Sequence, residues 1–138
     1  MEIKLLSENS KVPTYATDDS AAFDLYAAED AVVPAHGQVL VDTGIAVAIP
    51  RGKCGQIWPR SGMDVGAQVT RGAGLIDADY RGPVKVLLIN RGFLEYPVSA
   101  GDRIAQMVIT TAFRESFEVV DELPATERGA GGFGHTGR

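Results

Sequence analysis

The sequence predicts an all-β domain. Short apolar runs are broken by turn-forming residues every ~8–12 positions, which is the spacing of strands in a sandwich or barrel. No window of about 11 residues has convincing helical periodicity, so residues 61–66 are expected to form at most one short helical turn. The chain has 138 residues, of which 45% are hydrophobic and 22% are charged. These values are typical of one globular domain with its own core.

The first half of the chain is predicted to form a strand wherever an apolar run ends at turn residues. The expected strands cover residues 3–6, 23–27, 31–33, 38–41 and 45–49. Pro34-Ala35-His36-Gly37 supplies a reversal after 31–33, because proline fixes φ and glycine tolerates positive φ. Large and small side chains alternate over 45–49, which suits a strand that is packed on both faces.

The second half of the chain repeats this pattern. The expected strands cover residues 54–58, 74–76, 84–90, 96–98, 104–111 and 117–120. The turns between them are Pro50-Arg51-Gly52, Arg81-Gly82-Pro83, Asn90-Arg91-Gly92 and Ala100-Gly101-Asp102. We therefore expect an all-β sandwich or barrel over residues 1–120, followed by a glycine-rich segment over residues 121–138.

Charge and composition exclude several kinds of partner. The net charge of −5 argues against broad nucleic-acid binding, which needs a basic face. No apolar run approaches the ~20 residues that span a bilayer, and the first residues contain no signal-peptide core. The single cysteine, Cys54, excludes an internal disulfide and fits a buried structural thiol. We expect a cytoplasmic or other reducing intracellular compartment, no secretion, and neither nucleic-acid nor membrane partners.

The glycine-rich end satisfies the pattern GxGxxG over residues 129–134. A dinucleotide-binding loop needs a strand before it and a helix after it, and this segment predicts neither. Two interpretations remain open: a disordered terminus, or an arm that closes over a base and its phosphates. The arm would offer Arg128 as a cation, Phe133 as a stacking face, and the pair His135-Thr136.

Asp77 and Asp79 follow an apolar run and precede a glycine turn. If the strand continued regularly, Asp77, Asp79 and Arg81 would share one face. The two acids would then suit a metal pair or a base with its neighbour; alternatively, they cap their own turn. Elsewhere, Pro59-Arg60-Ser61-Gly62 offers a guanidinium fork, a hydroxyl and backbone amides suited to phosphate oxygens. Gln106 is a lone amide in an otherwise apolar strand.

The order of these segments is similar to that of the trimeric deoxyuridine triphosphate nucleotidohydrolases, or dUTPases, from about Lys11 to the end of the chain. Counterparts of that family's ordered motifs are residues 21–27 (AAFDLYA), 59–62 (PRSG), 74–82 (GLIDADYRG), 101–106 (GDRIAQ) and 128–137 (RGAGGFGHTG). The resemblance implies a distorted β-barrel, or jelly-roll, of the dUTPase type with a flexible C-terminal arm.

The resemblance also implies how a deoxyuridine is read. Backbone groups of Gly74, Leu75 and Ile76, and of Lys85, would contact the uracil edge and exclude a 5-methyl group. Tyr80 would lie against the sugar, where a 2′-hydroxyl does not fit. A tight pocket rejects an added group by steric clash, and unpaired backbone groups penalise a base with another donor pattern.

For the reaction, the resemblance assigns Asp77 as the base that orients and deprotonates water for attack on the α-phosphorus of dUTP. The products would be dUMP and pyrophosphate. The residues expected to bind the phosphates and the base are Arg60, Ser61, Gly62, Gln106, Arg128, Phe133, Gly134, His135 and Thr136. Phe133 would stack on uracil, and for His135 the backbone amide is favoured over the side chain. Arg103 is left open between a phosphate contact and a framework pair.

Mg²⁺ is the implied cofactor, carried mainly by the triphosphate, with Asp24 touching it only through water. The resemblance further implies a homotrimer in which each site takes motifs from three subunits. Three positions depart from the usual pattern: Ala22, Trp58 and His135 stand in place of a glycine, a smaller apolar residue and a serine. The alternatives to a dUTPase are a dCTP deaminase, a catalytically silent signalling barrel and a plain structural trimer.

Overall fold

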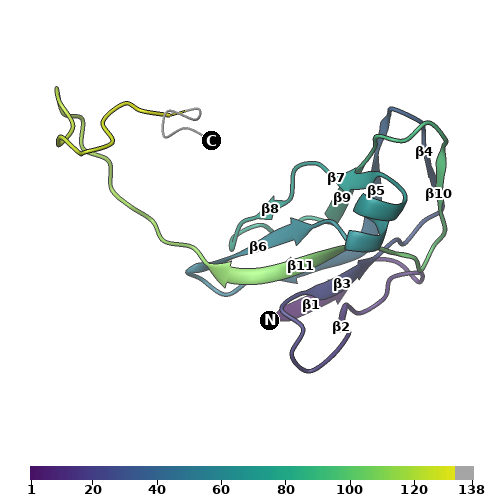
Figure 1. The fold of residues 1–138 in the computed structure, drawn as a ribbon. Coiled ribbons are helices and arrows are strands. Elements are labelled where there is room, and N and C mark those ends of the chain that lie inside the picture. The colour runs from purple at the N-terminus through teal and green to yellow at the C-terminus, as the bar shows by residue number, and fades with distance from the viewer. Residues whose placement is uncertain (133–138) are drawn as a thin grey trace.

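The computed structural model describes residues 1–132 and is almost entirely β (Figure 1). Its strands are β1 (Glu2–Leu5), β2 (Thr14–Tyr15), β3 (Phe23–Tyr26), β4 (Ala31–Val33), β5 (Gln38–Ala48), β6 (Lys53–Trp58), β7 (Val69–Arg71), β8 (Leu75–Ile76), β9 (Val84–Asn90), β10 (Tyr96–Val98) and β11 (Arg103–Thr111). One short π-helix, η1 (Gly62–Gly66), lies between β6 and β7. The predicted single helical turn at this place is confirmed.

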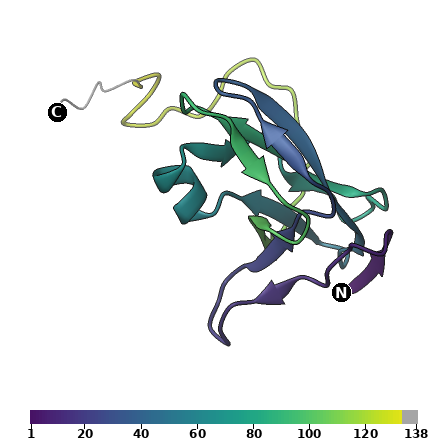
Figure 2. The ribbon, with the colours of Figure 1, turned by 90° about the vertical axis from the view of Figure 1, so that its right-hand side faces the viewer.

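Antiparallel sheets enclose the core. One sheet has the strand order β1-β5-β9-β7, a second has β2-β3-β11-β6-β8, and β4 pairs with β10. The core is made of aliphatic side chains with Phe23 and two methionines, and fully buried members include Leu25, Ile57, Leu88 and Met107. Figure 2 shows the sheets wrapped around this interior. The predicted distorted β-barrel of the jelly-roll type is confirmed.

The structure corrects several expected strand boundaries. The runs 38–41 and 45–49 belong to one strand, β5, which carries a register shift against β9 between Asp42 and Ile45. Such a bulge lets a strand pass through a Thr43-Gly44 step that looks like a turn in the sequence. The short strands β2 and β7 were not predicted, because each is held by pairing with a longer neighbour rather than by its own apolar pattern.

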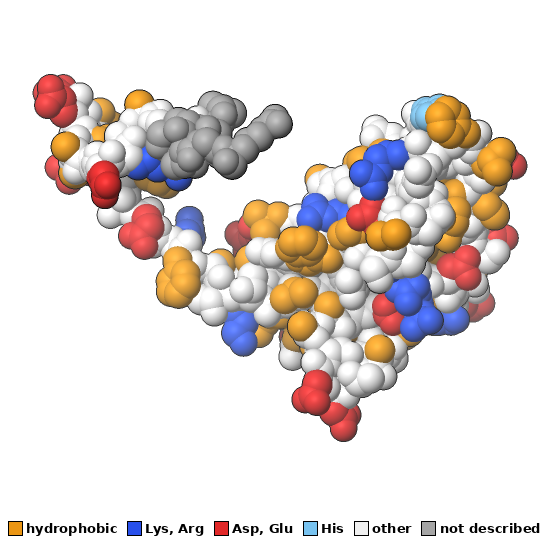
Figure 3. All heavy atoms as spheres, viewed as in Figure 1, with side chains coloured by type: hydrophobic (Ala, Val, Ile, Leu, Met, Phe, Trp, Pro, Cys, Tyr) orange, Lys and Arg blue, Asp and Glu red, His pale blue; other side chains and the backbone are white. Residues whose placement is uncertain are grey.

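The predicted strand over residues 117–120 is wrong. Residues 112–120 have no regular secondary structure, and the chain from 112 to 132 leaves the body in Figure 1. Hydrophobic side chains lie on the surface of this segment (Figure 3). Phe113, Phe117, Val119 and Leu123 are at least 84% exposed. A β-prone sequence forms no strand here because nothing on the body pairs with it.

Within residues 1–132, no helix has the length and apolarity that crossing a membrane requires.

Candidate active site

Residues 74–84, called the hairpin from here on, run from β8 into β9; β8 pairs with β6 and β9 with β5 and β7, so the two strands lie in different sheets. The chain turns before the acidic residues of this segment can form a strand. β8 ends at Ile76, and the Tyr80 amide donates to the Asp77 carbonyl at 3.2 Å. Asp77, Asp79 and Arg81 therefore do not share a strand face: of the two alternatives left open by the sequence, the continued strand is excluded and the acids lie in a turn. Arg81 Nη1 instead donates to the carbonyl oxygens of Ala78 and Tyr80 at 2.7 and 2.8 Å, so it braces the turn.

This turn forms one side of a hollow of about 300 Å³ between β5, β8 and the start of β9. The lining residues are Leu40, Leu75, Ile76, Asp77, Tyr80, Pro83 and Lys85. Of the residues that the resemblance assigns to nucleoside binding, Leu75, Ile76, Tyr80 and Lys85 line this hollow and Gly74 does not. Asp77 is exposed, and none of the four ion pairs formed by the described residues includes it. Its carboxylate is available to a water molecule.

Two glycines of the hairpin are required by local packing. A Cβ at Gly74 would lie 2.8 Å from Ile57 Cβ, and one at Gly82 would lie 2.5 Å from the Tyr80 hydroxyl oxygen. That hydroxyl donates to the Pro83 carbonyl at 3.0 Å. The Tyr80 ring is therefore held over Gly82, at the edge of the hollow.

The Pro59-Arg60-Ser61-Gly62 segment links β6 to η1. The Arg60 carbonyl accepts hydrogen bonds from the amides of Met63 and Asp64, both at 3.0 Å, which turns Ser61 and Gly62 outward into solvent. A Cβ at Gly62 would meet no atom of the described chain within 4 Å, and its φ is not in the left-handed region. Nothing within the chain itself requires glycine here; close approach by a ligand would.

Asp24 on β3 holds two arginines. Its Oδ1 lies 3.1 Å from Arg60 Nε and its Oδ2 lies 3.2 Å from Arg103 Nη1. Arg60 Nη1 also donates to the Arg103 carbonyl at 3.3 Å. Asp24 is 8% exposed, so a nearly buried carboxylate fixes both guanidinium groups at the surface. The sequence analysis left framework pairing open for Arg103 and favoured a phosphate contact for Arg60; the structure pairs both arginines with Asp24.

Gln106 lies beside this arginine cluster (Asp24, Arg60 and Arg103). It is opposite Asp24 in the β11–β3 pairing and opposite Trp58 in the β11–β6 pairing. Its Nε2 donates to the Pro59 carbonyl at 2.9 Å, which links β11 to the segment 59–62. The Trp58 ring is half exposed and has the Arg71 guanidinium 5.5 Å from its centroid.

The hollow and the arginine cluster do not meet within one chain. In the antiparallel pair β6–β8, Gly55 is opposite Ile76, so Asp77 lies near the start of β6, whereas Arg60 follows its end. Six residues of strand separate the two places, which is roughly 20 Å.

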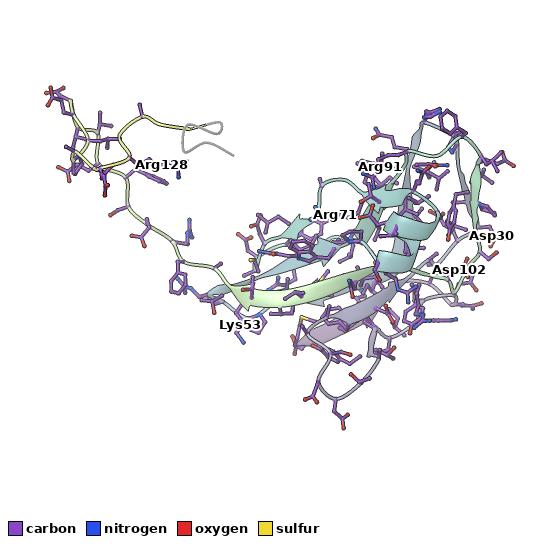
Figure 4. The ribbon with its side chains drawn as sticks, viewed as in Figure 1. Asp30, Lys53, Arg71, Arg91, Asp102 and Arg128 are labelled. Carbon is purple, nitrogen blue, oxygen red and sulfur yellow. The ribbon has the colours of Figure 1, made fainter. Side chains whose placement is uncertain are left out.

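Arg128 lies on the extended segment, apart from Arg71 and Asp102 of the body (Figure 4). Its Nε donates to the Gly131 carbonyl at 2.8 Å, and the Gly131 amide donates to the Arg128 carbonyl at 3.0 Å. The expectations for Phe133, Gly134, His135 and Thr136 fall outside the described residues.

Asp42 was not singled out by the sequence analysis. Its carboxylate oxygen Oδ2 lies 3.3 Å from Nζ of Lys85, a residue that lines the hollow. The available signal was the Asp42-Thr43-Gly44 step inside an apolar run, since an isolated glycine in a strand indicates a bulge.

The solved structures that share this fold include dUTPases of two bacteriophages. A Staphylococcus bacteriophage 80alpha dUTPase, solved with dUPNHPP, is 27% identical with a TM-score of 0.94, and the match covers 99% of this chain and 98% of that one. A substituted dUTPase of the S. aureus phage phi11, whose structure describes the coordination of a structural Mg(II) ion, is 26% identical with a TM-score of 0.83 over 88% of this chain. The class of protein is thus an all-β nucleotidohydrolase barrel.

The sequence comparisons define the family within this class. A dUTPase family model matches residues 8–137. The deoxyuridine 5′-triphosphate nucleotidohydrolase of Yarrowia lipolytica is 46% identical over 99% of this chain and 88% of its own length. That of Solanum lycopersicum is 45% identical over 98% of this chain and 80% of its own. The chain belongs to the dUTPase family.

Proposed function

We propose that this protein hydrolyses dUTP to dUMP and pyrophosphate, with Asp77 as the general base. The observation that carries the mechanism is the exposed Asp77 carboxylate, free of any ion pair among residues 1–132, at the rim of the hairpin hollow. Water attacks the α-phosphorus while Asp77 takes its proton, and the bond to the bridging oxygen breaks in line. Such reactions need mainly positioning and charge neutralisation.

The hollow supports selection of a deoxyuridine. Its lining residues come from β5, β8 and β9 with Tyr80 at the edge, so a base that enters lies beside two hydrogen-bonded strands. We assign uracil recognition to the backbone of residues 74–76 and of Lys85. A cytosine presents the wrong donor pattern to such groups, and a ribose 2′-hydroxyl would meet the Tyr80 ring.

The arginine cluster supports binding of the phosphate chain. Arg60 uses Nε on Asp24 and Nη1 on a carbonyl, which leaves Nη2 for an oxyanion, and Ser61 and Gly62 present exposed backbone. We assign these residues and Gln106 to the phosphates. Arg103 is positioned through the same Asp24 and widens the positive surface.

Mg²⁺ fits this site as an ion carried by the substrate. Among residues 1–132, no group of three or more His, Cys, Asp or Glu side chains is arranged to hold a metal, so a cage made only of protein is not available. Both Asp24 oxygens already face guanidinium groups, which suits a contact through water rather than direct ligation. When bound, the ion neutralises phosphate charge.

A homotrimer with shared sites accounts for the separation between Asp77 and Arg60. A triphosphate chain cannot bridge roughly 20 Å of strand while its base occupies the hollow, so one subunit supplies the hairpin and another the arginine cluster. The exposed apolar segment 112–132 supports donation of the arm to a further subunit. Arg128 would bring a cation to the phosphates, with Phe133 to stack on uracil and Gly134, His135 and Thr136 to close around them.

The first test is a nucleotide panel with purified protein and Mg²⁺. Pyrophosphate release from dUTP is expected to exceed release from dTTP, dCTP and UTP by at least about a hundredfold, because unpaired polar groups reject cytosine and steric clash rejects the 5-methyl group and the 2′-hydroxyl. Equal turnover of all four would refute the specificity argument. Ammonia release from dCTP would indicate the deaminase alternative instead.

The second test mixes two inactive variants. Asp77→Asn removes the base and Arg60→Ala removes the phosphate contact, so each homotrimer is expected to be nearly inactive. If sites are shared, refolding the two variants together creates mixed trimers in which some sites have both residues intact, and activity reappears. Activity that stays at the level of the separate variants would show that each site is built from one chain.

A further inference from the structure

The bulge in β5 is built around Asp42. Gly44 adopts φ +66°, and its amide donates to Asp42 Oδ1 at 2.7 Å, while the register against β9 shifts between Asp42 and Ile45. The buried Thr43 hydroxyl donates to the Val84 carbonyl at 2.5 Å. The bulge is therefore fastened to the start of β9, where that strand enters the hairpin hollow.

Asp42 itself is held on several sides. Its amide donates to Glu29 Oε1 at 3.0 Å, and its carbonyl accepts from the Ala28 amide at 2.9 Å. With one carboxylate oxygen on Gly44, the other is left for Lys85 Nζ at 3.3 Å. Asp42 is thus a fixed anchor, and the long Lys85 side chain is the flexible partner.

Lys85 and Asp77 line the same hollow, as its one cation and its one carboxylate among the described residues. Opposite charges that share one partly enclosed hollow attract one another. A carboxylate paired with an ammonium group is a weaker base and no longer presents both oxygens to water. A Lys85 side chain without its anchor would therefore compete with the attacking water for Asp77.

We propose that Asp42 is a positioning residue for the reaction: it holds the Lys85 ammonium against β5 and so keeps Asp77 free for water. This inference rests on the proposed role of Asp77 as the base. It assigns Asp42 a task in turnover, in addition to its part in the bulge.

The test uses Asp42→Asn, because an asparagine oxygen still accepts from the Gly44 amide while the charge that holds Lys85 is lost. The expected result is a kcat for dUTP that is roughly tenfold lower, a fraction of what a positioned general base contributes. KM should change by less than about threefold, since the walls of the hollow stay in place. In Asp42→Asn/Lys85→Met, which removes the competing ammonium, kcat is expected to recover to above that of Asp42→Asn.

Asp30→Asn is the matched control. Asp30 Oδ1 accepts from the Ala100 amide at 2.8 Å, so the same change is made to another carboxylate that caps a backbone amide (Figure 4). This variant is expected to keep the wild-type kcat. Asp42→Ser repeats the test with a hydroxyl cap, and thermal melts verify that each variant is folded.

The outcomes separate the inference from the function on which it rests. A wild-type protein that does not hydrolyse dUTP would overturn the proposed function and this inference with it. An active wild type with an unchanged Asp42→Asn variant, or with a double variant as slow as Asp42→Asn, would overturn the inference alone. If the double variant is as slow as Asp42→Asn, Asp42 would act only through the bulge.

Discussion

The hairpin hollow and the arginine cluster differ in how their charges are balanced. In the arginine cluster, the nearly buried Asp24 carboxylate is satisfied by Arg60 and Arg103 within one chain. At the hollow, Asp77 is exposed and has no ion-pair partner among residues 1–132. The first arrangement is complete within the chain, whereas in the proposed reaction the second is completed by the substrate and its water.

This contrast separates stability from turnover. Removing one member of a nearly buried ion pair leaves the other charges unpaired, which destabilises the fold. Removing an exposed, unpaired carboxylate leaves the folded state almost unchanged. We therefore expect substitutions in the arginine cluster to change the free energy of unfolding, and substitutions of Asp77 to change the rate of reaction.

The largest expected effect is that of Asp77→Asn. Loss of the general base should lower kcat by about 10²–10⁴, because this is what a positioned base contributes. Binding of the dUTP analogue dUpNHpp should persist, and the free energy of unfolding should change by less than about 0.5 kcal/mol. Steady-state kinetics, calorimetric titration and urea unfolding measure the three quantities. A nearly normal kcat would show that another group activates the water.

Truncation after residue 120 is expected to have the next largest effect. The shortened chain loses Arg128 and Phe133, for which we propose stacking on uracil, and base–aromatic stacking alone contributes about 1–3 kcal/mol. The value of kcat/KM for dUTP should therefore fall by at least about tenfold, while circular dichroism shows an unchanged β-body. Full activity of the truncated protein would reduce the arm to a passive tail.

Asp24→Ala tests the contribution of the arginine cluster to stability. The free energy of unfolding is expected to fall by about 1–3 kcal/mol, because two guanidinium groups lose their partner. This is less than the ~3–5 kcal/mol for breaking a fully buried pair, since the Arg60 and Arg103 side chains are 30% and 49% exposed and solvent screens them. Asp64→Ala, which breaks the exposed pair with Arg91, is the control. It should change the free energy of unfolding by less than about 0.5 kcal/mol. Equal losses in the two variants would show that burial of Asp24 adds nothing.

The sequence was sufficient for the fold class and for the segments that carry the site, but not for how the segments meet. Strands such as β9 and β10 were predicted at their observed bounds, because each is an apolar run between strong turn residues. The strand expected over residues 117–120 failed because strand formation needs a pairing partner, which local sequence does not reveal. Likewise, the separation of Asp77 from Arg60 follows from the pairing register of β6 and β8, and no single segment encodes that register.

The pairings of single side chains were the least predictable part. Asp24 was expected near a metal ion, and its two arginine partners come from segments far apart in the chain. Asp42 was passed over because it lies between the two apolar runs 38–41 and 45–49 that were expected to be separate strands. Both contacts depend on which strands become neighbours, so they follow from the fold and not from local sequence spacing.

The smallest expected effect separates two roles of Tyr80. Its hydroxyl donates to the Pro83 carbonyl, and its ring lies over Gly82 at the edge of the hollow. Tyr80→Phe removes only an exposed hydrogen bond, which is worth about 0.5–1.5 kcal/mol, so kcat/KM for dUTP should fall by less than about tenfold and UTP should still be rejected.

Tyr80→Ala removes the ring as well, and with it the surface that a 2′-hydroxyl would meet. Discrimination between dUTP and UTP, measured as the ratio of their kcat/KM values, should therefore narrow in Tyr80→Ala but hold in Tyr80→Phe. If both variants lose discrimination equally, the hydroxyl acts by fixing the turn. If neither does, sugar selection belongs to another residue, and the hollow would bind the base alone.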